Sequence, residues 1–354
     1  MVFACAEHSR FIHSLGVYEL ANRLLNNASV VKLFSEREQV LLLASCLLHD
    51  LGHGAFSHAF ESTFKVNHEK IGARIIQENP EIRQILDGVD SRFAVDVSQV
   101  ILKESKYPLI EKLVSGQIDV DRLDYLRRDA YFTGVSYGYV DFERILRVLR
   151  IENGQIVFKE SGIHAIENYL ISRYHMYCQV YFHKTTRGYE IILEKIYQRI
   201  YELVRQGTIL PGDTSLITQI TNHPDDLITY LKIDDSYIHT LLVSLMDCQD
   251  LILKTLIGDL LHRKLWKAID LNKISEQDLE KIKKQNPFFW AIQGTSSFTY
   301  IDLEGGQTPI YILSEDGKIS PIEQVSPLIN SLIMSGTKTD LVLFYREETP
   351  DLRR

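Results

Sequence analysis

The sequence predicts a mainly α-helical fold with a smaller α+β portion at the C-terminal end. Apolar residues recur at helical spacing through most of residues 10–270. From residue 298 onward the pattern changes to short alternating stretches, which are typical of strands. We therefore expect a helical core over residues 1–205, followed by a helical and α+β portion over residues 206–354.

The first predicted helices have clear boundary signals. Residues 10–27 carry apolar positions at helical spacing, which stop at an Asn pair. Residues 35–49 open with a Ser-x-x-Glu capping box made by Ser35 and Glu38. The loop GHGAFSH follows this second helix. Further helical patterns lie at residues 67–78, 92–103, 107–115, 119–132 and 141–150.

The rest of the chain is expected to alternate between helices and short strands. The Asn-Gly turn in IENGQIVF predicts a strand pair at residues 150–159. A long helix is expected from Gly162 to about Arg205, with a break or bend near residues 183–188. Residues 206–215 are predicted to be a loop and residues 216–270 further helices. In the tail, strands are expected in FTYIDLE, TPIYILSEDGKISPI and TDLVLFYREE, with a hairpin turn at Glu-Asp-Gly.

The composition is that of an ordinary globular protein, with 45% hydrophobic and 24% charged residues. The net charge of −8 argues against a broad nucleic-acid-binding surface. The longest apolar run, VLLLASCLL, is shorter than the ~20 residues that a membrane span needs. The first residues, MVFACAEHSRF, lack the pattern of a signal peptide. Four scattered cysteines without a CxxC motif indicate reduced, mostly buried thiols and a cytoplasmic protein.

The most informative motif is the doublet His49–Asp50, which ends an apolar helix. Burying such a pair is costly unless a charge compensates it, and a divalent metal ion would do so. Neighbouring residues of a helix point about 100° apart, so His49 and Asp50 can both reach one ion only if the ion lies beside the helix end. Gly52, two residues later, would end the helix there. His13 and Asp121, on two other predicted helices, are further possible ligands. A pair that merely caps the helix is the alternative, but HSRFIHS, HDLGHGAFSH and IDVDRLDY in this order favour a metal site.

Mixed imidazole and carboxylate ligands restrict the type of ion. They suit one divalent ion such as Mg, Mn, Fe, Co or Zn with bound water, whereas a structural zinc usually recruits thiolates. An ion with open positions can polarise a phosphoryl oxygen or lower the pKa of water. The motif therefore indicates hydrolytic chemistry.

Three histidines and a carboxylate follow the doublet: His53, His58, His68 and Glu61. Protonated imidazoles bind phosphate oxygens, and one of them could act as general acid toward a leaving group. This set therefore matches phosphate ester hydrolysis. Two alternatives stay open, namely that His68 is only a polar residue at a helix N-terminus and that Glu61 faces solvent.

A stripe of cations and tyrosines is expected on the long helix after residue 162. Arg173 and Lys184 are roughly three helical turns apart, and Tyr177 and Tyr181 fall on the same predicted face. Such a stripe could line a nucleotide pocket, with cations on phosphates and tyrosines against sugar or base. The alternative is a solvated face with tyrosines packed at a domain or subunit contact.

A similar mixture of residues lies close to the candidate metal ligands. It comprises Arg10, Arg122, Tyr125 and Asp129. Asp129 could accept a hydrogen bond from a sugar hydroxyl, or it could pair with Arg127 or Arg128. We therefore expect a nucleotide site in contact with the metal.

With these motifs in this order, the chain resembles the HD-domain superfamily of metal-dependent phosphohydrolases. It is most similar to the deoxynucleoside triphosphate triphosphohydrolases, which include bacterial enzymes and the vertebrate sterile-alpha-motif/HD enzyme. The motifs that carry the resemblance are EHSRFIHSLG, HDLGHGAFSH, IDVDRLDYLRRD and MYCQVYFHK. The match is strong from about Ala6 to about residue 205 and weaker toward the tail. It implies an HD-domain helical bundle as the core of the fold.

The resemblance also implies roles for individual residues. The four metal ligands would be His13, His49, Asp50 and Asp121. The residues acting around the α-phosphate would be His53, His58 and His68, with His68 a candidate acid or base and Glu61 beside them. The phosphate-binding residues would be Arg10, Arg122 and Arg173. Tyr125 and Asp129 would meet the deoxyribose, and Tyr181 would exclude a 2′-hydroxyl by its bulk. The implied reaction is water attack at the α-phosphorus, which yields a deoxynucleoside and inorganic triphosphate.

The chain departs from the family pattern at four places. Glu61 stands where many relatives have aspartate, Arg122 replaces a lysine of the vertebrate enzyme, and Tyr177 replaces its histidine. Relatives also carry an additional N-terminal segment before EHSRF, which helps to close the nucleotide pocket and to form an activator site. We therefore expect weaker base and sugar discrimination and impaired nucleotide activation.

Two other functions remain as alternatives. One is a phosphohydrolase of the same superfamily acting on a nucleoside monophosphate, a cyclic nucleotide or an alarmone. The other is an oligomer that senses nucleotides or binds single-stranded nucleic acid without turnover, although the net acidity disfavours nucleic acid. The expected partners are a nucleotide substrate, a nucleotide activator and further copies of the chain in a dimer or tetramer, with no membrane.

Overall fold

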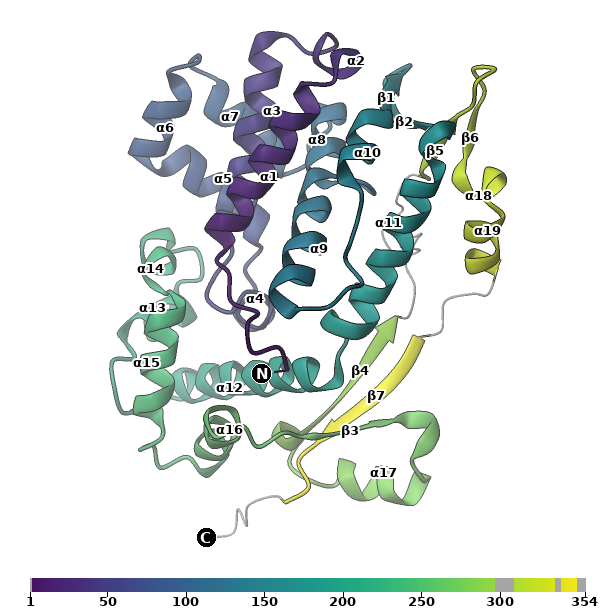
Figure 1. Ribbon diagram of the computed structural model, residues 1–354. Coiled ribbons are helices and arrows are strands. Elements are labelled where there is room, and N and C mark those ends of the chain that lie inside the picture. Colours follow the sequence, from purple (N-terminus) through teal and green to yellow (C-terminus); the bar gives the residue numbers. More distant parts are fainter. Residues whose placement is uncertain (1, 297–308, 335–338, 349–354) are drawn as a thin grey trace.

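The computed structural model describes residues 2–296, 309–334 and 339–348, and it is mainly helical with two small sheets (Figure 1). This confirms the predicted fold class. None of the described helices is both long and apolar enough to cross a membrane. Cys46 and Cys248 are buried, but Cys178 is only partly buried and Cys5 is exposed. The expectation of mostly buried thiols is therefore right for two of the four cysteines.

The N-terminal helices build the body that carries the candidate site. In chain order they are α1 (Arg10–Leu25), α2 (Ala28–Val31), α3 (Glu36–Leu48), α4 (His58–Phe64), α5 (His68–Glu78), α6 (Pro80–Asp87), α7 (Phe93–Ile101), α8 (Pro108–Ser115), α9 (Val120–Thr133), α10 (Phe142–Val148) and α11 (Ile163–Met176). The predicted capping box opens α3, since Ser35 and Glu38 each accept a hydrogen bond from the other's backbone N–H. Leu41, Leu42 and Phe93 are fully buried in the core that α1, α3, α7 and α9 share.

Most of the remaining helices form a second body below the first (Figure 1). They are α12 (Lys184–Arg205), α13 (Ser215–Asn222), α14 (Leu227–Lys232), α15 (Asp235–Leu245), α16 (Leu251–Leu261) and α17 (Glu276–Lys283). The last two helices, α18 (Ile322–Val325) and α19 (Pro327–Met334), lie beside α11 in the first body. A second apolar cluster includes Ile196 and Tyr197 of α12 together with Phe344.

Two sheets connect distant parts of the chain. The first has the order β1 (Leu149–Glu152), β2 (Gln155–Lys159), β5 (Tyr311–Leu313) and β6 (Ile319–Pro321). The second has the order β3 (Lys267–Asp270), β7 (Thr339–Tyr345) and β4 (Trp290–Ser296). The predicted hairpins β1–β2 and β5–β6 are both present, and Gly317 takes the left-handed conformation in the second turn. Because β5 pairs with β2, the C-terminal part returns to the helical core. The division of the chain at residue 205 stays a prediction.

Several predicted elements need correction. The helical patterns missed α2, α4 and α6, which are short. Residues 267–270 were expected to be helical, but they form β3 because Ile269 and its neighbours pair with β7. The expected strand FTYIDLE lies outside the described residues.

The long helix after residue 162 breaks earlier than predicted. Residues Tyr177–Tyr181 form a π-helical turn, and α12 begins only at Lys184. His183 caps α12, since its Nδ1 accepts a hydrogen bond from the backbone N–H of Thr185. Gly188, which suggested the later break, lies inside α12, where an added Cβ would only touch Phe344 at 3.8 Å.

Candidate active site

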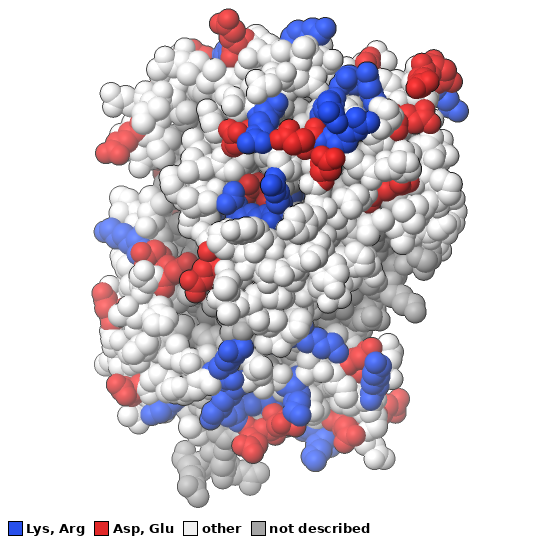
Figure 2. Space-filling view, viewed as in Figure 1, with Lys and Arg blue, Asp and Glu red and all other residues white. Residues whose placement is uncertain are grey.

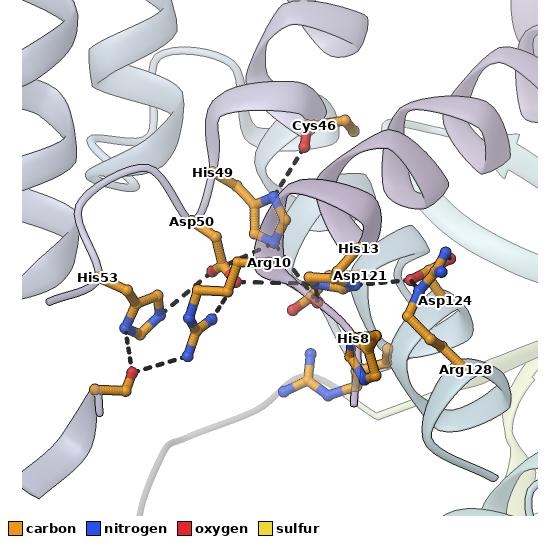
Figure 3. Close-up of polar contacts among 12 residues, drawn as sticks. His8, Arg10, His13, Cys46, His49, Asp50, His53, Asp121, Asp124 and Arg128 are labelled. Carbon is orange, nitrogen blue, oxygen red and sulfur yellow. Dashed lines mark hydrogen bonds and ion pairs between the residues drawn. The ribbon is translucent and has the colours of Figure 1, made fainter. Parts of the chain in front are cut away.

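The four predicted metal ligands come together between α1, α9 and the end of α3 (Figure 3). His13 lies on α1, Asp121 lies in the first turn of α9, and His49 and Asp50 follow the last residue of α3. The Nε2 atom of His13 is 3.1 Å from Asp121 Oδ1 and 3.9 Å from Asp50 Oδ2. The Nε2 atom of His49 is 3.6 Å from Asp121 Oδ1 and 3.4 Å from Asp50 Oδ1. Two imidazoles and two carboxylates thus face one small volume.

The chemistry of these atoms fits a bound cation. His49 Nδ1 donates to the backbone carbonyl of Cys46 at 2.8 Å, which directs Nε2 toward the carboxylates. This Nε2 atom is buried and has no hydrogen-bond partner among the described atoms. It therefore offers a lone pair, and the neighbouring carboxylates of Asp50 and Asp121 also offer only lone pairs. A positive charge is required between these three groups. A proton or a divalent ion meets this requirement. The ligand atoms of His13, His49 and Asp121 all lie within 4.8 Å of one another, and divalent metals accept such a donor set.

The carboxylates in this cluster are held in their ionised form. Burial raises the pKa of Asp121, but the His13 and His49 imidazoles beside it outweigh this effect, so the pKa lies well below its usual range. Burial acts likewise on Asp50, and His53, His49 and Arg10 lower its pKa. Arg10 donates to Asp50 Oδ2 at 2.5 Å and to Ser57 Oγ at 2.8 Å. The cluster is therefore rich in negative charge, and cations compensate it.

Gly52 has a different role from the predicted one. It does not have the positive φ of a left-handed helix cap. Instead, a Cβ at this position would lie 2.0 Å from the carbonyl oxygen of His68 and 2.3 Å from the backbone nitrogen of Gly72. Gly52 therefore allows the loop after α3 to contact the backbone of α5 closely.

Glu61 connects two of the predicted catalytic histidines. Its Oε1 is 2.9 Å from His53 Nδ1, and its Oε2 is 2.8 Å from His68 Nδ1. The two imidazole rings stack with centroids 3.9 Å apart. Burial raises the pKa of Glu61, but the bonds from both histidines lower it well below its usual range. Glu61 thus faces the site and not solvent, and His53 Nε2 lies 3.4 Å from Asp50 Oδ1. The side chain of His58 lies outside the described part of the structure.

The predicted sugar-binding residues form a second group, on α9 and on the π-helical turn. The hydroxyls of Tyr125 and Tyr177 are 3.3 Å apart, and the Tyr181 hydroxyl donates to Asp129 Oδ2 at 2.6 Å. The ring of Tyr181 packs edge-on against Tyr125 and Tyr177. His8 contacts the other carboxylate oxygen of Asp129 at 2.7 Å. Asp129 is thus engaged by a tyrosine and a histidine.

The arginines near this group have different environments. Arg128 pairs with Asp124, and Arg127 lies over the ring of Phe142, so neither pairs with Asp129 as one alternative proposed. Arg122 is partly buried and donates to Asp119 and to the backbone carbonyl of Gly116.

The predicted stripe of four residues from Arg173 to Lys184 is only partly formed. Arg173 is buried, with its guanidinium carbon 5.7 Å from the centre of the Tyr177 ring, and it donates to Gln117 at 3.3 Å. Tyr177 and Tyr181 follow on the π-helical turn. Lys184 is the exposed first residue of α12, beyond the break, so the expectation of one continuous face is wrong at Lys184.

One contact of the site was missed by the sequence analysis. Asp124 Oδ2 is 2.7 Å from His13 Nδ1, on the side of the ring opposite the metal cluster. Burial lowers the pKa of His13, but the hydrogen bonds that its ring donates to Asp121 and Asp124 outweigh this effect and raise the pKa to about 9. Asp124 follows Asp121 by three residues on α9, and this spacing was the available signal. A cavity of about 870 Å³ between α1, α9 and residues 139–143 is lined by Asp124 but by none of the predicted metal ligands.

Comparison with known proteins identifies the fold family. Residues 10–129 match the HD domain, and residues 140–287 match the HD-associated region. The uncharacterized protein YwfO of Bacillus subtilis is 39% identical over 98% of this chain and 83% of its own length. The chain belongs to the HD-domain family. Among solved structures, this HD-domain protein is similar to a phosphohydrolase from Bacteroides thetaiotaomicron, with a TM-score of 0.83 and 29% identity over 98% of this chain and 89% of the other.

More distant relatives include named enzymes. A deoxynucleoside triphosphate triphosphohydrolase SAMHD1 homolog from Dictyostelium discoideum is 32% identical over 54% of this chain and 40% of its own length. The enzyme named SAMHD1 from Danio rerio is 25% identical over 69% of this chain and 45% of its own length. These matches confirm the predicted resemblance and the classification of this HD-domain protein as a phosphohydrolase.

Proposed function

We propose that this protein hydrolyses deoxynucleoside triphosphates to the deoxynucleoside and inorganic triphosphate. The observation that carries the proposal is the arrangement along α9. Asp121, Tyr125 and Asp129 are spaced four residues apart, so they share one face of this helix. The face leads from the metal cluster to the hydroxyl and carboxylate groups of Tyr125, Tyr181 and Asp129, which could hydrogen-bond a sugar. The named triphosphohydrolase relatives support the choice of substrate.

We propose that His13, His49, Asp50 and Asp121 hold one divalent ion, of the Mg, Mn, Fe, Co or Zn type. When bound, such an ion polarises a phosphoryl oxygen and lowers the pKa of water. The protein supplies the charge balance, because two buried carboxylates attract the ion and Arg10 is close enough to interact with a phosphate beside it.

In the proposed reaction, the histidines around Glu61 serve the α-phosphate. Glu61 binds the Nδ1 atoms of His53 and His68. The Nε2 atom of His53 lies 3.4 Å from Asp50 Oδ1, beside the metal cluster, and we propose that both histidines contact phosphate oxygens there. Burial lowers the pKa of His53, but Asp50 and Glu61 raise it, which favours the charged form that binds a phosphate. We propose His68 as the group that gives a proton to the leaving deoxynucleoside, with His58 nearby in sequence as a further phosphate ligand.

The proposed sugar and phosphate contacts use the second group of residues. The Tyr181 hydroxyl already donates a hydrogen bond to Asp129, so the ring and hydroxyl of Tyr181 would leave little space for a 2′-hydroxyl. Tyr125 and Tyr177 would contact the deoxyribose. Arg122 and Arg173 each keep a buried Nε–H without a partner among the described atoms. Such donors favour an anionic ligand, and we propose that both bind the triphosphate with Lys184 at its outer end.

Product analysis tests the proposed function. The protein is incubated with a panel of dNTPs and NTPs under Mg²⁺, Mn²⁺, Fe²⁺, Co²⁺ and Zn²⁺, beside an Asp50→Ala control. We expect inorganic triphosphate and a deoxynucleoside from dNTPs, with much less product from NTPs. Release of phosphate or pyrophosphate would instead indicate one of the other nucleotide substrates, and full activity of Asp50→Ala would refute the metal site.

We further propose that the protein is a cytoplasmic homo-oligomer. Phe11, Leu15 and Tyr18 are exposed at successive turns of α1, and such an apolar row is common at subunit contacts. Basic and acidic side chains are interspersed over the face shown in Figure 2, which fits a nucleotide partner better than a long nucleic acid. Light scattering after gel filtration would reveal a dimer or tetramer, and Leu15→Glu should shift it toward the monomer.

A further inference from the structure

We propose that Asp124 is a positioning residue for the metal centre. It fixes the orientation of the His13 imidazole, while Arg128 and Gly16 fix Asp124. The inference rests on the proposed metal site and is independent of the identity of the nucleotide.

The contact between Asp124 and His13 determines which ring nitrogen meets the metal. A carboxylate only accepts hydrogen bonds, so the 2.7 Å contact requires the proton on His13 Nδ1. The lone pair of the neutral ring then lies on Nε2, which faces Asp121 at 3.1 Å. A carboxylate that holds the far nitrogen of a metal-binding histidine fixes the ring and makes it a stronger ligand.

Arg128 holds the Asp124 carboxylate in place from one helical turn further along α9. Its Nε donates to Asp124 Oδ2 at 2.7 Å, and its terminal NH2 donates to Oδ1 at 2.8 Å. This two-bond geometry leaves the carboxylate little freedom to rotate. The aspartate is thus a fixed, charged acceptor directed at His13.

Gly16 makes room for this pair. It lies on α1 three residues after His13, on the same side of the helix. A Cβ at this position would be 2.0 Å from Asp124 Oδ1 and 2.3 Å from the NH2 nitrogen of Arg128. Any larger residue would therefore push the pair away from α1 and rotate or release the His13 ring.

A purely structural role for the pair would be to join α1 to α9. Such a role would affect stability but not the affinity of the metal site. A matched pair exists elsewhere in the protein, since Asp259 is buried and accepts two hydrogen bonds from Arg346 at 2.7 and 3.2 Å. Comparing the two pairs separates positioning from stability.

The test measures metal binding without nucleotide. Metal-free protein is titrated with Mn²⁺ by calorimetry, and the visible absorption spectrum of the Co²⁺ complex reports ligand geometry. We expect Asp124→Asn to weaken Mn²⁺ binding by about 10- to 100-fold and to change the Co²⁺ spectrum. Asp259→Asn should lose comparable stability and keep the parental affinity and spectrum, and Asp124→Glu should restore part of the affinity.

A second variant keeps every charge in place. Gly16→Ala should also weaken Mn²⁺ binding, even though alanine favours a helix, whereas Gly188→Ala in α12 should not. If Asp124→Asn does not fold, Gly16→Ala decides the question. Parental affinity and spectrum in the folded variants would overturn the inference, and so would a parent protein that binds neither metal. A parent that binds metal but does not hydrolyse dNTPs would overturn only the proposed substrate.

Discussion

A substitution of Glu61 can remove its charge between His53 and His68 while its shape is kept. Glutamine has almost the same shape, but its amide nitrogen would face one of the two Nδ1–H groups that Glu61 now accepts. We expect Glu61→Gln to lower kcat for hydrolysis by about 10²-fold, the range of lost acid–base catalysis. The metal content should not change, because Glu61 touches none of the four proposed ligands. The control is Glu19→Gln, at an exposed ion pair on α1, which should keep full activity.

His13 makes a prediction about pH for the metal-free protein. Its folded pKa is about 9 against an ordinary value of 6.5, so its stabilising contribution is complete below pH 6.5 and is lost as the pH rises through 9. The loss amounts to at most ~3 kcal/mol. The pKa values of His49 and His53 are also raised, which acts in the same direction, while the lowered pKa values of Asp50 and Asp121 act only in acid.

Urea unfolding of metal-free protein at pH 6 and pH 9 measures this loss. Added Mn²⁺ should reverse the trend, because metal binding displaces protons from the histidines and becomes stronger at higher pH. His13→Gln should show a smaller dependence on pH between these values. Equal stability of the metal-free protein at both pH values would contradict the assignment.

At the scale of elements, the loop after α3 depends on Gly52. An alanine Cβ would collide with the backbone of α5, and backbone cannot move aside as a flexible side chain can. We expect Gly52→Ala to lower the free energy of unfolding by about 2 kcal/mol or more and to weaken metal binding, because Asp50 and His53 flank the loop. Urea unfolding and calorimetry measure the two effects, with Gly188→Ala as the control. Unchanged metal affinity would show that the loop adapts without moving its ligands.

The elements also show what the sequence could predict. Helical spacing and the capping box at Ser35 located α3, and the order of the motifs identified the four candidate ligands before any geometry was known. Helical spacing predicted the wrong face for Lys184, because the π-helical turn shifts every later residue around the helix axis. Local sequence patterns do not indicate such a turn. Asp124 was missed because its function depends on the packing of α9 against α1, which no local pattern specifies.

At the scale of the whole molecule, the two apolar cores are expected to unfold together. Ile312 of β5 is 1% exposed in the N-terminal core, although it lies far beyond residue 205 in the chain. Ser326, from the same C-terminal part, donates to Glu167 of α11 at 2.5 Å. Residues before 205 also belong to the second core, since α12 packs against α16 and β7 there. Neither core is therefore closed by a continuous part of the sequence.

Ile312→Ala tests this cooperativity in the full chain. We expect a loss of about 2–5 kcal/mol in the free energy of unfolding, as for other large-to-small core substitutions. Unfolding should remain a single transition, and Mn²⁺ should raise its midpoint in both parent and variant, because the metal ligands belong to the same cooperative unit. Leu341→Ala, at an exposed position of β7, is the control and should change little. Two transitions, of which only one responds to Mn²⁺, would instead show that the C-terminal part folds as a separate domain.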